Sequence, residues 1–231
     1  MKHLLLLFIA LFFSPFVLAQ DDFAKKNVVD SLYREDQFYL GITYNLLSKK
    51  PSGVSQNKFS SGLHFGVIRD MPINKRRNKA IGIGLGLSIN AYNQNLLITK
   101  SNKDLVYSVL DSDAIDFSIN KFYTYVLEMP IQYRWRTSTP TEYSFWRIYT
   151  GFKVGYVFAN GTNYLGDPEN IRLKNTNAFT NFQYGLTLST GYNTWNFYLY
   201  YGLNNLFDNA TIDDEALDIS AIKVGLMFYI L

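Results

Sequence analysis

The stretch KFYTYVLEMPIQYRWR (Lys121–Arg136), followed by FWRIYTGFKVGYVF (Phe145–Phe158), decides the fold. In the second arm, alternate positions from Trp146 to Phe158 carry mostly large apolar side chains, while the positions between them carry Arg147, glycines and Lys153. This period-2 alternation runs well past the ~5–6 residues of an ordinary soluble strand. It predicts a long β-hairpin with one face toward lipid and the other toward a narrow lumen, as in a transmembrane β-barrel.

The composition bounds the remaining possibilities. A chain of 231 residues suits one domain, and it contains no cysteine for a disulfide or a lipid anchor. Beyond the first 20 residues no apolar run approaches the ~18–20 residues that a transmembrane helix needs. The mean hydropathy of −0.07 resembles that of a soluble protein, but barrel strands evade such scans because half of each strand is polar. The net charge of +3 is mild and dispersed, so nucleic acid is not expected as a partner.

The N-terminus reads as an export signal. Lys2, an apolar run and the tripeptide Val17-Leu18-Ala19 match the three parts of a secretory signal peptide, with cleavage expected after Ala19. The polar residues 20–36 are expected to form a loose periplasmic segment, and residues 37–231 the barrel. The expected location is therefore the outer membrane of a Gram-negative cell.

The alternation extends to eight strands, an even number. This predicts an all-β fold, an eight-stranded antiparallel up-and-down transmembrane β-barrel, monomeric and surrounded by outer-membrane lipid and lipopolysaccharide. Connections after the odd-numbered strands are longer, so the short turns are expected in the periplasm and the long loops outside. The expected strands are Phe38–Leu47, Lys58–Asp70, Lys79–Asn93, Phe122–Trp135, Phe145–Ala159, Ala178–Thr190, Trp195–Leu206 and Asp218–Ile230.

Several residues have expected structural places in this barrel. Trp135, Trp146 and Trp195 flank the short turns and should form an aromatic girdle at one membrane interface. Pro130 faces inward and cannot donate a ladder hydrogen bond, which predicts a bulge or local bend. The glycines of IGIGLGLSIN recur every second residue, so they make room in the lumen; a phosphate-binding loop needs another spacing and a following helix.

Glu128 is the main candidate for chemistry, because it faces inward and Lys153 lies almost opposite. A buried carboxylate must be paired or neutralised. We therefore expect a polar cluster that fastens the lumen, with a proton or ligand site as the alternative; its members are Glu128, Lys153, Lys223, His64 and Gln132. Arg134 and Arg147 are expected to face each other at a solvated lumen mouth and to reach other partners such as Glu142 or lipid phosphates.

Two charged connections are further candidates. The loop between Asp208 and Asp218 and the segment Asp111–Asp116 are acidic, and carboxylates are ligands for Ca²⁺, but their spacing matches no calcium loop. Solvated loop charge is therefore preferred, with no metal and no cofactor. The turn with Lys75, Arg76 and Arg77 is basic; it is either a soluble turn at the membrane edge or a contact for a periplasmic partner.

The whole chain resembles the PorT-like family of small outer-membrane β-barrels, often called the porin family. The resemblance rests on the signal peptide, FYLGITYN, IGIGLGLSIN, LEMPIQYRW and an aromatic-rich last strand ending at Leu231, with Leu127-Glu128-Met129-Pro130 as its most specific piece. The final residue departs from the terminal aromatic common in such barrels, and Phe228 and Tyr229 are expected to supply the assembly signal. The resemblance implies a link to protein secretion.

These observations predict a non-enzymatic protein, a structural or interaction and assembly component, with a secretion-machinery protein as candidate partner. The surfaces expected to carry this role are the loops Gln94–Asn120 and Asn160–Asn177 and the basic turn. One alternative is a small-solute channel, which the narrow lumen of eight strands disfavours. The other is a lipid-modifying enzyme, which is disfavoured because His64, the histidine of the mature chain, faces the lumen away from substrate.

Overall fold

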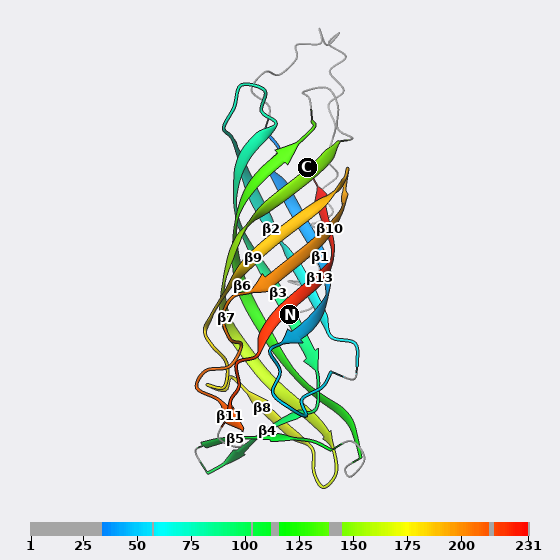
Figure 1. Cartoon of the computed structure of the whole chain (residues 1–231), viewed down its shortest axis with the longest axis vertical. Coiled ribbons are helices and arrows are strands. Elements are labelled where there is room, and N and C mark those ends of the chain that lie inside the picture. The colour runs from blue at the N-terminus through cyan, green and yellow to red at the C-terminus, as the bar shows by residue number, and fades with distance from the viewer. Residues whose placement is uncertain are drawn as a thin grey trace, which may run out of the picture. The chain divides into compact units, whose positions relative to one another are not determined.

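Eight antiparallel strands close into a barrel within the part of the chain that the computed structural model describes, residues 34–56, 58–102, 104–111, 116–138, 145–212 and 215–230. Each strand pairs with the next along the chain, and β1 pairs with the last strand, β13 (Figure 1). The barrel strands are β1 (Gln37–Ser48), β2 (Ser61–Pro72), β3 (Lys79–Asn93), β6 (Phe117–Arg136), β7 (Trp146–Gly166), β9 (Phe182–Tyr192), β10 (Trp195–Gly202) and β13 (Ser220–Ile230). This confirms the predicted fold class.

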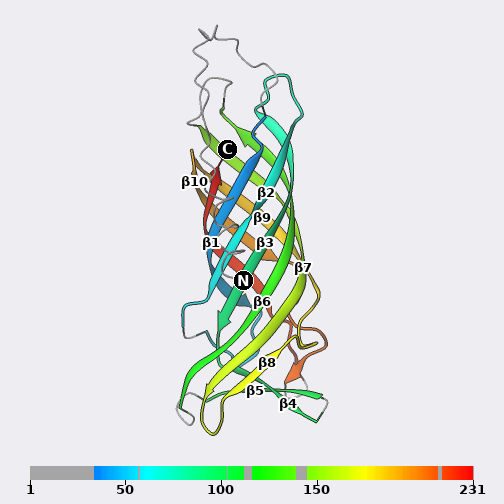
Figure 2. The ribbon, with the colours of Figure 1, turned by 180° about the vertical axis from the view of Figure 1, so that it is seen from behind.

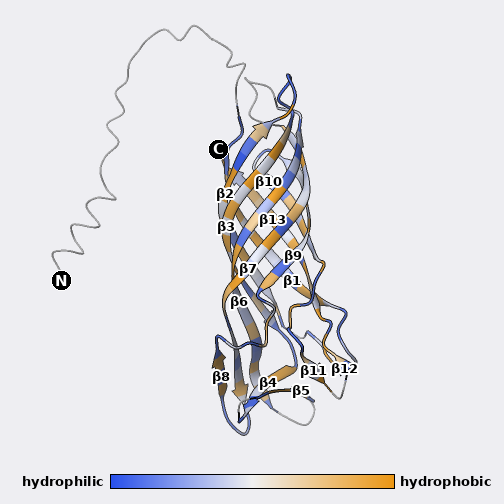
Figure 3. Ribbon diagram, turned by 90° about the vertical axis from the view of Figure 1, so that its left-hand side faces the viewer, coloured by the Kyte–Doolittle hydropathy of each residue, from blue (hydrophilic) through white to orange (hydrophobic). Residues whose placement is uncertain are grey.

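Hydrophobic and hydrophilic residues follow one another along the barrel strands (Figure 3), and the exposed fractions show that the large apolar side chains face outward, as predicted. On β7, Trp146 and Phe158 are 57% and 54% exposed, while the intervening Tyr149 and Lys153 are buried. On β1, Tyr39, Thr43 and Asn45 likewise point into the lumen. A soluble protein would place its large apolar side chains inside, so this inverted arrangement indicates a lipid environment.

The connections differ between the two ends of the barrel. Short connections after β2, β6 and β9 gather at one end, which we call the turn end, and longer ones gather at the other, the loop end (Figures 1 and 2). The loop end carries five further strands: β4 (Leu96–Ser101), β5 (Asp104–Val109), β8 (Ile171–Lys174), β11 (Thr211–Ile212) and β12 (Glu215–Ala216). None of the described residues forms a helix that is long and apolar enough to cross a membrane.

The hairpin β6–β7 is longer than predicted. We expected strands to begin at Phe122 and to end at Ala159, but pairing continues to Phe117 and Gly166. The two strands pair with each other beyond the barrel wall, and β8 then adds to the free edge of β7. Parts of the predicted loops 94–120 and 160–177 therefore belong to the sheet. Extending the hairpin lets the backbone N–H and C=O groups of the two strands form hydrogen bonds with each other.

Pro130 lies inward, as expected, but the predicted bulge is elsewhere. The β6–β7 register passes through Pro130 and Lys153 unchanged, and its two shifts occur between Phe117 and Ile119 and between Tyr125 and Val126. Pairing with β3 stays in the same register but omits the two pairs around Pro130, because proline has no N–H to donate. Next to the gap, Gly86, which is in register with Glu128, makes room for a large lumen side chain, since a Cβ there would overlap the Tyr39 hydroxyl.

Candidate functional site

A carboxylate with two basic partners occupies the middle of the lumen. Lys153 donates from Nζ to Glu128 Oε2 at 2.9 Å, and His64 Nδ1 lies 3.2 Å from Glu128 Oε1. The three residues come from β7, β6 and β2, and their register positions all face inward. Glu128, His64 and Lys153 are 2%, 0% and 6% exposed, so this contact is shielded from water.

The imidazole of His64 also contacts a hydroxyl. Thr43 Oγ1 lies 3.1 Å from His64 Nε2, which produces the order hydroxyl, imidazole, carboxylate that nucleophilic catalysis uses. Thr43 is 1% exposed, however, and its hydroxyl also donates to Asn45 Oδ1 at 2.9 Å. Sequence reasoning missed Thr43, because inward-facing threonines are common in barrel strands. The Thr43 hydroxyl is therefore shielded from water and held between Asn45 and His64.

Lys223 adds a second buried cation to the lumen. Its Nζ donates to Asn90 Oδ1 at 2.7 Å and lies 5.1 Å from the centre of the Tyr200 ring. Lys153 Nζ is likewise 5.1 Å from the centre of the Tyr198 ring. Aromatic faces attract cations, so the inward tyrosines help to hold both ammonium groups.

Gln132 lies nearer the turn end than the Glu128 contacts. It lines a cavity of about 10 Å³ together with Lys153, Tyr39 and Tyr229. This volume corresponds to roughly one water molecule. The predicted five residues therefore occupy one lumen: Glu128, Lys153 and His64 touch one another, Lys223 binds Asn90, and Gln132 borders the small cavity.

A second polar cluster lies at the turn end and replaces the solvated mouth that the sequence predicted. Asp70 Oδ1 accepts from Arg134 and from Arg136, both at 2.8 Å, and Arg136 also donates to Asp70 Oδ2 at 2.8 Å. Asp70 and both arginines are 0% exposed. The expected pairing of Arg134 with Arg147 is also wrong, because Arg134 is in register with Tyr149 and Arg147 with Arg136.

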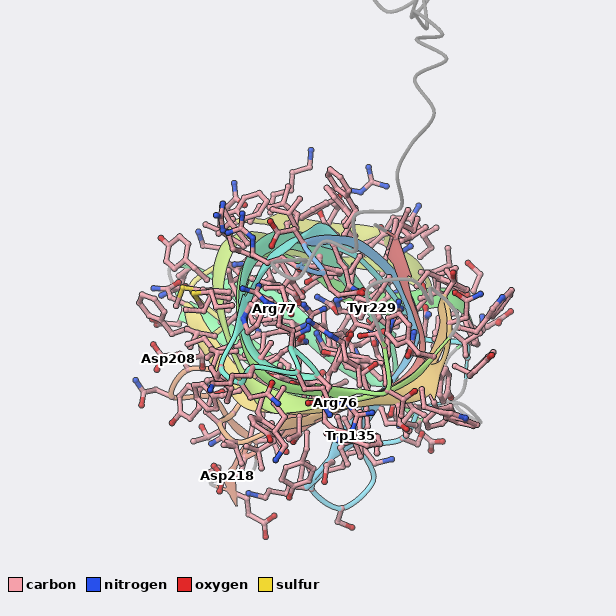
Figure 4. The ribbon with its side chains drawn as sticks, turned by 90° about the horizontal axis from the view of Figure 1, so that it is seen from above. Arg76, Arg77, Trp135, Asp208, Asp218 and Tyr229 are labelled. Atoms are coloured by element: carbon pink, nitrogen blue, oxygen red, sulfur yellow. The ribbon has the colours of Figure 1, made fainter. Side chains whose placement is uncertain are left out.

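Glu35 ties the residues before β1 to the same cluster. Its carbonyl accepts from Arg134 at 3.3 Å, and its carboxylate lies 4.0 Å from Arg147, which also donates to the Asn193 carbonyl at 2.6 Å. Burial raises the pKa of the Glu35 carboxyl above its ordinary value, although Arg136 and Arg147 oppose that shift. Seen along the barrel, Tyr229 lies within the ring of strands (Figure 4), and the centre of its ring is 5.9 Å from Arg134 Cζ and 6.0 Å from Arg147 Cζ. The partner proposed earlier for the arginines, Glu142, lies outside the described residues.

Apolar side chains fill the lumen at the loop end. Phe122 packs on Tyr92, Phe179 and Phe207, with ring centres 4.8, 5.4 and 5.3 Å apart. These rings come from β6, β3 and the loops before β9 and after β10. The loops therefore fold inward over the mouth and form an apolar plug above the polar cluster. The sequence did not predict this plug. Tyr92, Phe122 and Phe179 lie in strands that it predicted and Phe207 in a predicted loop, but no local pattern indicates that rings so far apart along the chain meet.

The three tryptophans all lie at the turn end. Trp146 and Trp195 are 57% and 64% exposed, and both are in register with Tyr192 of β9. Their rings contact Tyr192 and Phe228, with centres 5.6 and 4.8 Å apart. Trp135 is partly exposed on β6. Amphipathic rings of this kind lie at membrane interfaces, and this placement fits an aromatic girdle.

The basic turn and the acidic loop lie at opposite ends of the barrel. In the turn Ile73–Asn78, Lys75 and Arg76 are exposed, and Arg77 is partly buried with φ of 58°. Asp208 and Asp218 project outside the ring of strands (Figure 4), and Asp218 accepts from Asn205 at 2.7 Å. Asp213, Asp214 and Asp113 lie outside the described residues. Within the described ranges, no group of three His, Cys, Asp or Glu residues is placed to hold a metal ion.

The exterior, the closed sheet and the girdle together define a barrel of the outer-membrane type. A family model for the outer membrane protein beta-barrel domain matches residues 18–208. The chain belongs to this family, and its location is the outer membrane. Membership in the PorT-like subgroup is a finer assignment that the match does not address.

Comparisons with other proteins add little at the level of function. No curated protein matches the chain. Among solved structures, the chain is similar to Ail, the attachment invasion locus protein of Yersinia pestis, with 12% identity, a TM-score of 0.37, and coverage of 86% of this chain and 99% of that one. An engineered protein studied for asymmetric conductivity shows 10% identity, a TM-score of 0.15, and coverage of 86% and 100%. At these scores the likenesses carry no functional information.

Proposed function

We propose that this chain is a non-enzymatic outer-membrane barrel that works as a structural or interaction component through its two ends. The observation that carries the proposal is the filled lumen. The Asp70 arginine cluster, the Glu128 contacts and the apolar plug around Phe122 follow one another from the turn end to the loop end. A barrel of eight strands has an interior just wide enough for side chains, so water has no continuous path.

The test is the conductance of the purified mature protein in a planar bilayer, with an open porin as positive control. We expect no steady channels above the bare-bilayer background, because the charged contacts and the ring stack must separate before ions pass. Steady openings that scale with the amount of folded protein would establish the small-solute channel instead. Folding is checked on the same sample by a gel mobility that changes on boiling, since closed barrels resist detergent until heated.

The orientation and processing are part of the same proposal. The turn end faces the periplasm and the loop end faces outward, as the difference in connection length supports. Residues 1–19 are removed by cleavage after Ala19, residues 20–36 lie in the periplasm, and the barrel follows. Intact mass of the protein from outer membranes tests the cleavage site. Protease added to whole cells should cut the loop end and leave the turn around Lys75 intact.

The sharper version of the role is a link to protein secretion, and it rests on the PorT-like resemblance. In that version the basic turn with Lys75, Arg76 and Arg77 contacts a periplasmic component of the secretion machinery. A strain that carries Lys75→Gln/Arg76→Gln/Arg77→Gln should retain the folded barrel and lose exported cargo. Normal secretion in a strain lacking the whole protein would refute the link and leave the barrel proposal standing.

A further inference from the structure

Two aromatic belts mark the limits of the lipid-facing band. The girdle at the turn end includes Trp135 and Trp146; at the other limit, Tyr125 contacts Phe158 and Tyr156 contacts Phe182, with ring centres 6.2 and 5.3 Å apart. From Trp135 to Tyr125, and from Trp146 to Tyr156, each strand runs about ten residues. At ~3.3 Å per residue and a tilt of ~40° this spans about 25 Å, the height of the apolar band of such barrels.

Directly beyond the second belt, basic side chains gather on the outer face of the β6–β7–β8 sheet. Lys121 points outward, because its neighbours Asn120 and Phe122 are buried. Lys121 is in register with Asn163 of β7, and Asn163 is in register with Arg172 of β8. Neighbouring strands lie ~4.8 Å apart, so Lys121 and Arg172 are about 10 Å apart at their Cα atoms.

The next row of the sheet adds another cation on the same face. Tyr123 of β6 is in register with Gly161, which is in register with Lys174. Leu173, between Arg172 and Lys174, packs on the inner apolar plug, so both basic side chains are directed outward, and both are exposed. Lys174 thus lies in the same row as Tyr123, two residues along β6 from the belt residue Tyr125, and Lys121 lies in the next row, further from the lipid.

Lys58, which precedes β2, reaches the same region. It is exposed, and its Nζ donates to the Ser118 carbonyl on β6. Among the described residues, no carboxylate forms an ion pair with Lys58, Lys121, Arg172 or Lys174. The carboxylates of Asp116 and Asp167 lie beyond them at the hairpin tip, where Asp167 N donates to the Asp116 carbonyl.

Four cations without acidic partners, held at the level where headgroups begin, match an anionic lipid. The polar zone of a bilayer is roughly 5–8 Å thick on each side. With the same rise and tilt, the row of Lys174 lies about 5 Å beyond Tyr125, within this zone. The row of Lys121 and Arg172 lies about 10 Å beyond Tyr125, and these long side chains reach back to the zone. We propose that Lys58, Lys121, Arg172 and Lys174, the basic patch, bind the phosphate groups of lipopolysaccharide in the outer leaflet. Guanidinium and ammonium groups are the donors that phosphate prefers in proteins.

The test compares lipopolysaccharide binding by the folded mature protein and by two charge-matched variants in a neutral detergent. The patch variant is Lys121→Gln/Arg172→Gln/Lys174→Gln. The control variant, Lys75→Gln/Arg76→Gln/Lys79→Gln, removes as many exposed positive charges from the turn end. Each protein is titrated with labelled lipopolysaccharide, with the same lipopolysaccharide after removal of its lipid A phosphates, and with phosphatidylglycerol. Boiled and unboiled gels confirm that each variant is folded.

We expect the patch variant to bind lipopolysaccharide on the order of a hundredfold more weakly, since each of its three basic residues near a charged membrane surface contributes roughly fivefold. The control variant should bind lipopolysaccharide as tightly as the wild type does. The wild type should bind dephosphorylated lipopolysaccharide more weakly, by about the same factor as the patch variant loses with intact lipopolysaccharide. Lys121→Arg/Lys174→Arg, which keeps the charge, should bind nearly normally.

Equal losses of lipopolysaccharide affinity in the patch and control variants would overturn the proposal, because binding would then depend on the total charge of the protein and not on the basic patch. Undiminished binding of dephosphorylated lipopolysaccharide, or equally tight binding of phosphatidylglycerol, would overturn it too. The patch is on the outside of the barrel, so a channel-forming result in the conductance experiment would leave this inference intact. The inference rests on the proposed orientation, with the loop end outward, which the protease experiment tests separately from lipopolysaccharide binding.

Discussion

Neutralising Glu128 tests how the lumen holds its charges. Glu128→Gln keeps the shape of the side chain but removes the charge that contacts Lys153 and His64. Two ammonium groups, on Lys153 and Lys223, then remain buried, with Asn90 and the tyrosine rings as their neighbours. Removing one partner of a buried ion pair costs roughly 3–5 kcal/mol, and we expect Glu128→Gln to fall in that range.

Removing the charge of Lys153 should lower the free energy of unfolding by less than removing the charge of Glu128. In Lys153→Met the carboxylate of Glu128 keeps its contact with His64 and remains within electrostatic reach of Lys223. The loss is then about 2 kcal/mol, the value for one hydrogen bond to a charged group. In the double variant Glu128→Gln/Lys153→Met both charges of the pair are absent. Its destabilisation should be smaller than the sum of the two single losses by about 2 kcal/mol.

The assay is equilibrium unfolding in urea of each protein refolded into phospholipid vesicles, followed by tryptophan fluorescence and by the boiling-dependent gel shift. Wild type and all three variants are measured under the same lipid and salt conditions. A loss below ~1 kcal/mol for Glu128→Gln would contradict the reasoning, because it would mean that water reaches the charges. A larger loss of unfolding free energy in Lys153→Met than in Glu128→Gln would also contradict the reasoning.

Three further predictions use the same unfolding assay. Asp70→Asn should cost roughly 3–5 kcal/mol, because two buried arginines lose their shared carboxylate; a loss below ~1 kcal/mol would indicate a hydrated cluster. The folded-state pKa of Glu35 lies above its ordinary value of 4.5. The stabilisation from protonated Glu35 is therefore complete below pH 4.5 and is lost as the pH rises through the folded-state pKa. Glu35→Gln should lack this decline, and an identical pH profile in both proteins would refute the assignment. Gly151→Ala should destabilise by about 1–3 kcal/mol, because a Cβ there overlaps the Ile131 carbonyl oxygen. Gly155→Ala is the milder control, since its nearest obstacle is the Val126 side chain, and equal losses would contradict this distinction.

The sequence predicted the local features of the barrel well, because period-2 alternation depends on one strand at a time. The strand Lys79–Asn93 has the predicted bounds, and Glu128 and Lys153 both face inward as the alternation indicated. Their contact was also foreseeable, since β6 and β7 are consecutive and a hairpin brings its own residues together.

The Asp70 cluster was not foreseeable in the same way. Asp70 and Arg134 are 64 residues apart in sequence, and they meet because β2 and β6 each flank β3 in the closed sheet. The stagger between strands decides which inward residues share a level of the lumen, and a single sequence does not encode that stagger in any local pattern. Without it, Arg134 and Arg147 looked like a solvated pair of like charges.

At the loop end, too, the local sequence pattern did not determine which side chains meet. Phe122 and Phe179 lie in predicted strands and Phe207 in a predicted loop, but no local pattern indicated that these three rings meet in the lumen. By itself the sequence determined the class of fold, the lipid-facing surface and the direction of each strand side chain, because these follow from local periodicity. Only the tertiary structure decided which charges meet, how the lumen is closed and where the basic patch lies, because these depend on the register between strands distant along the chain.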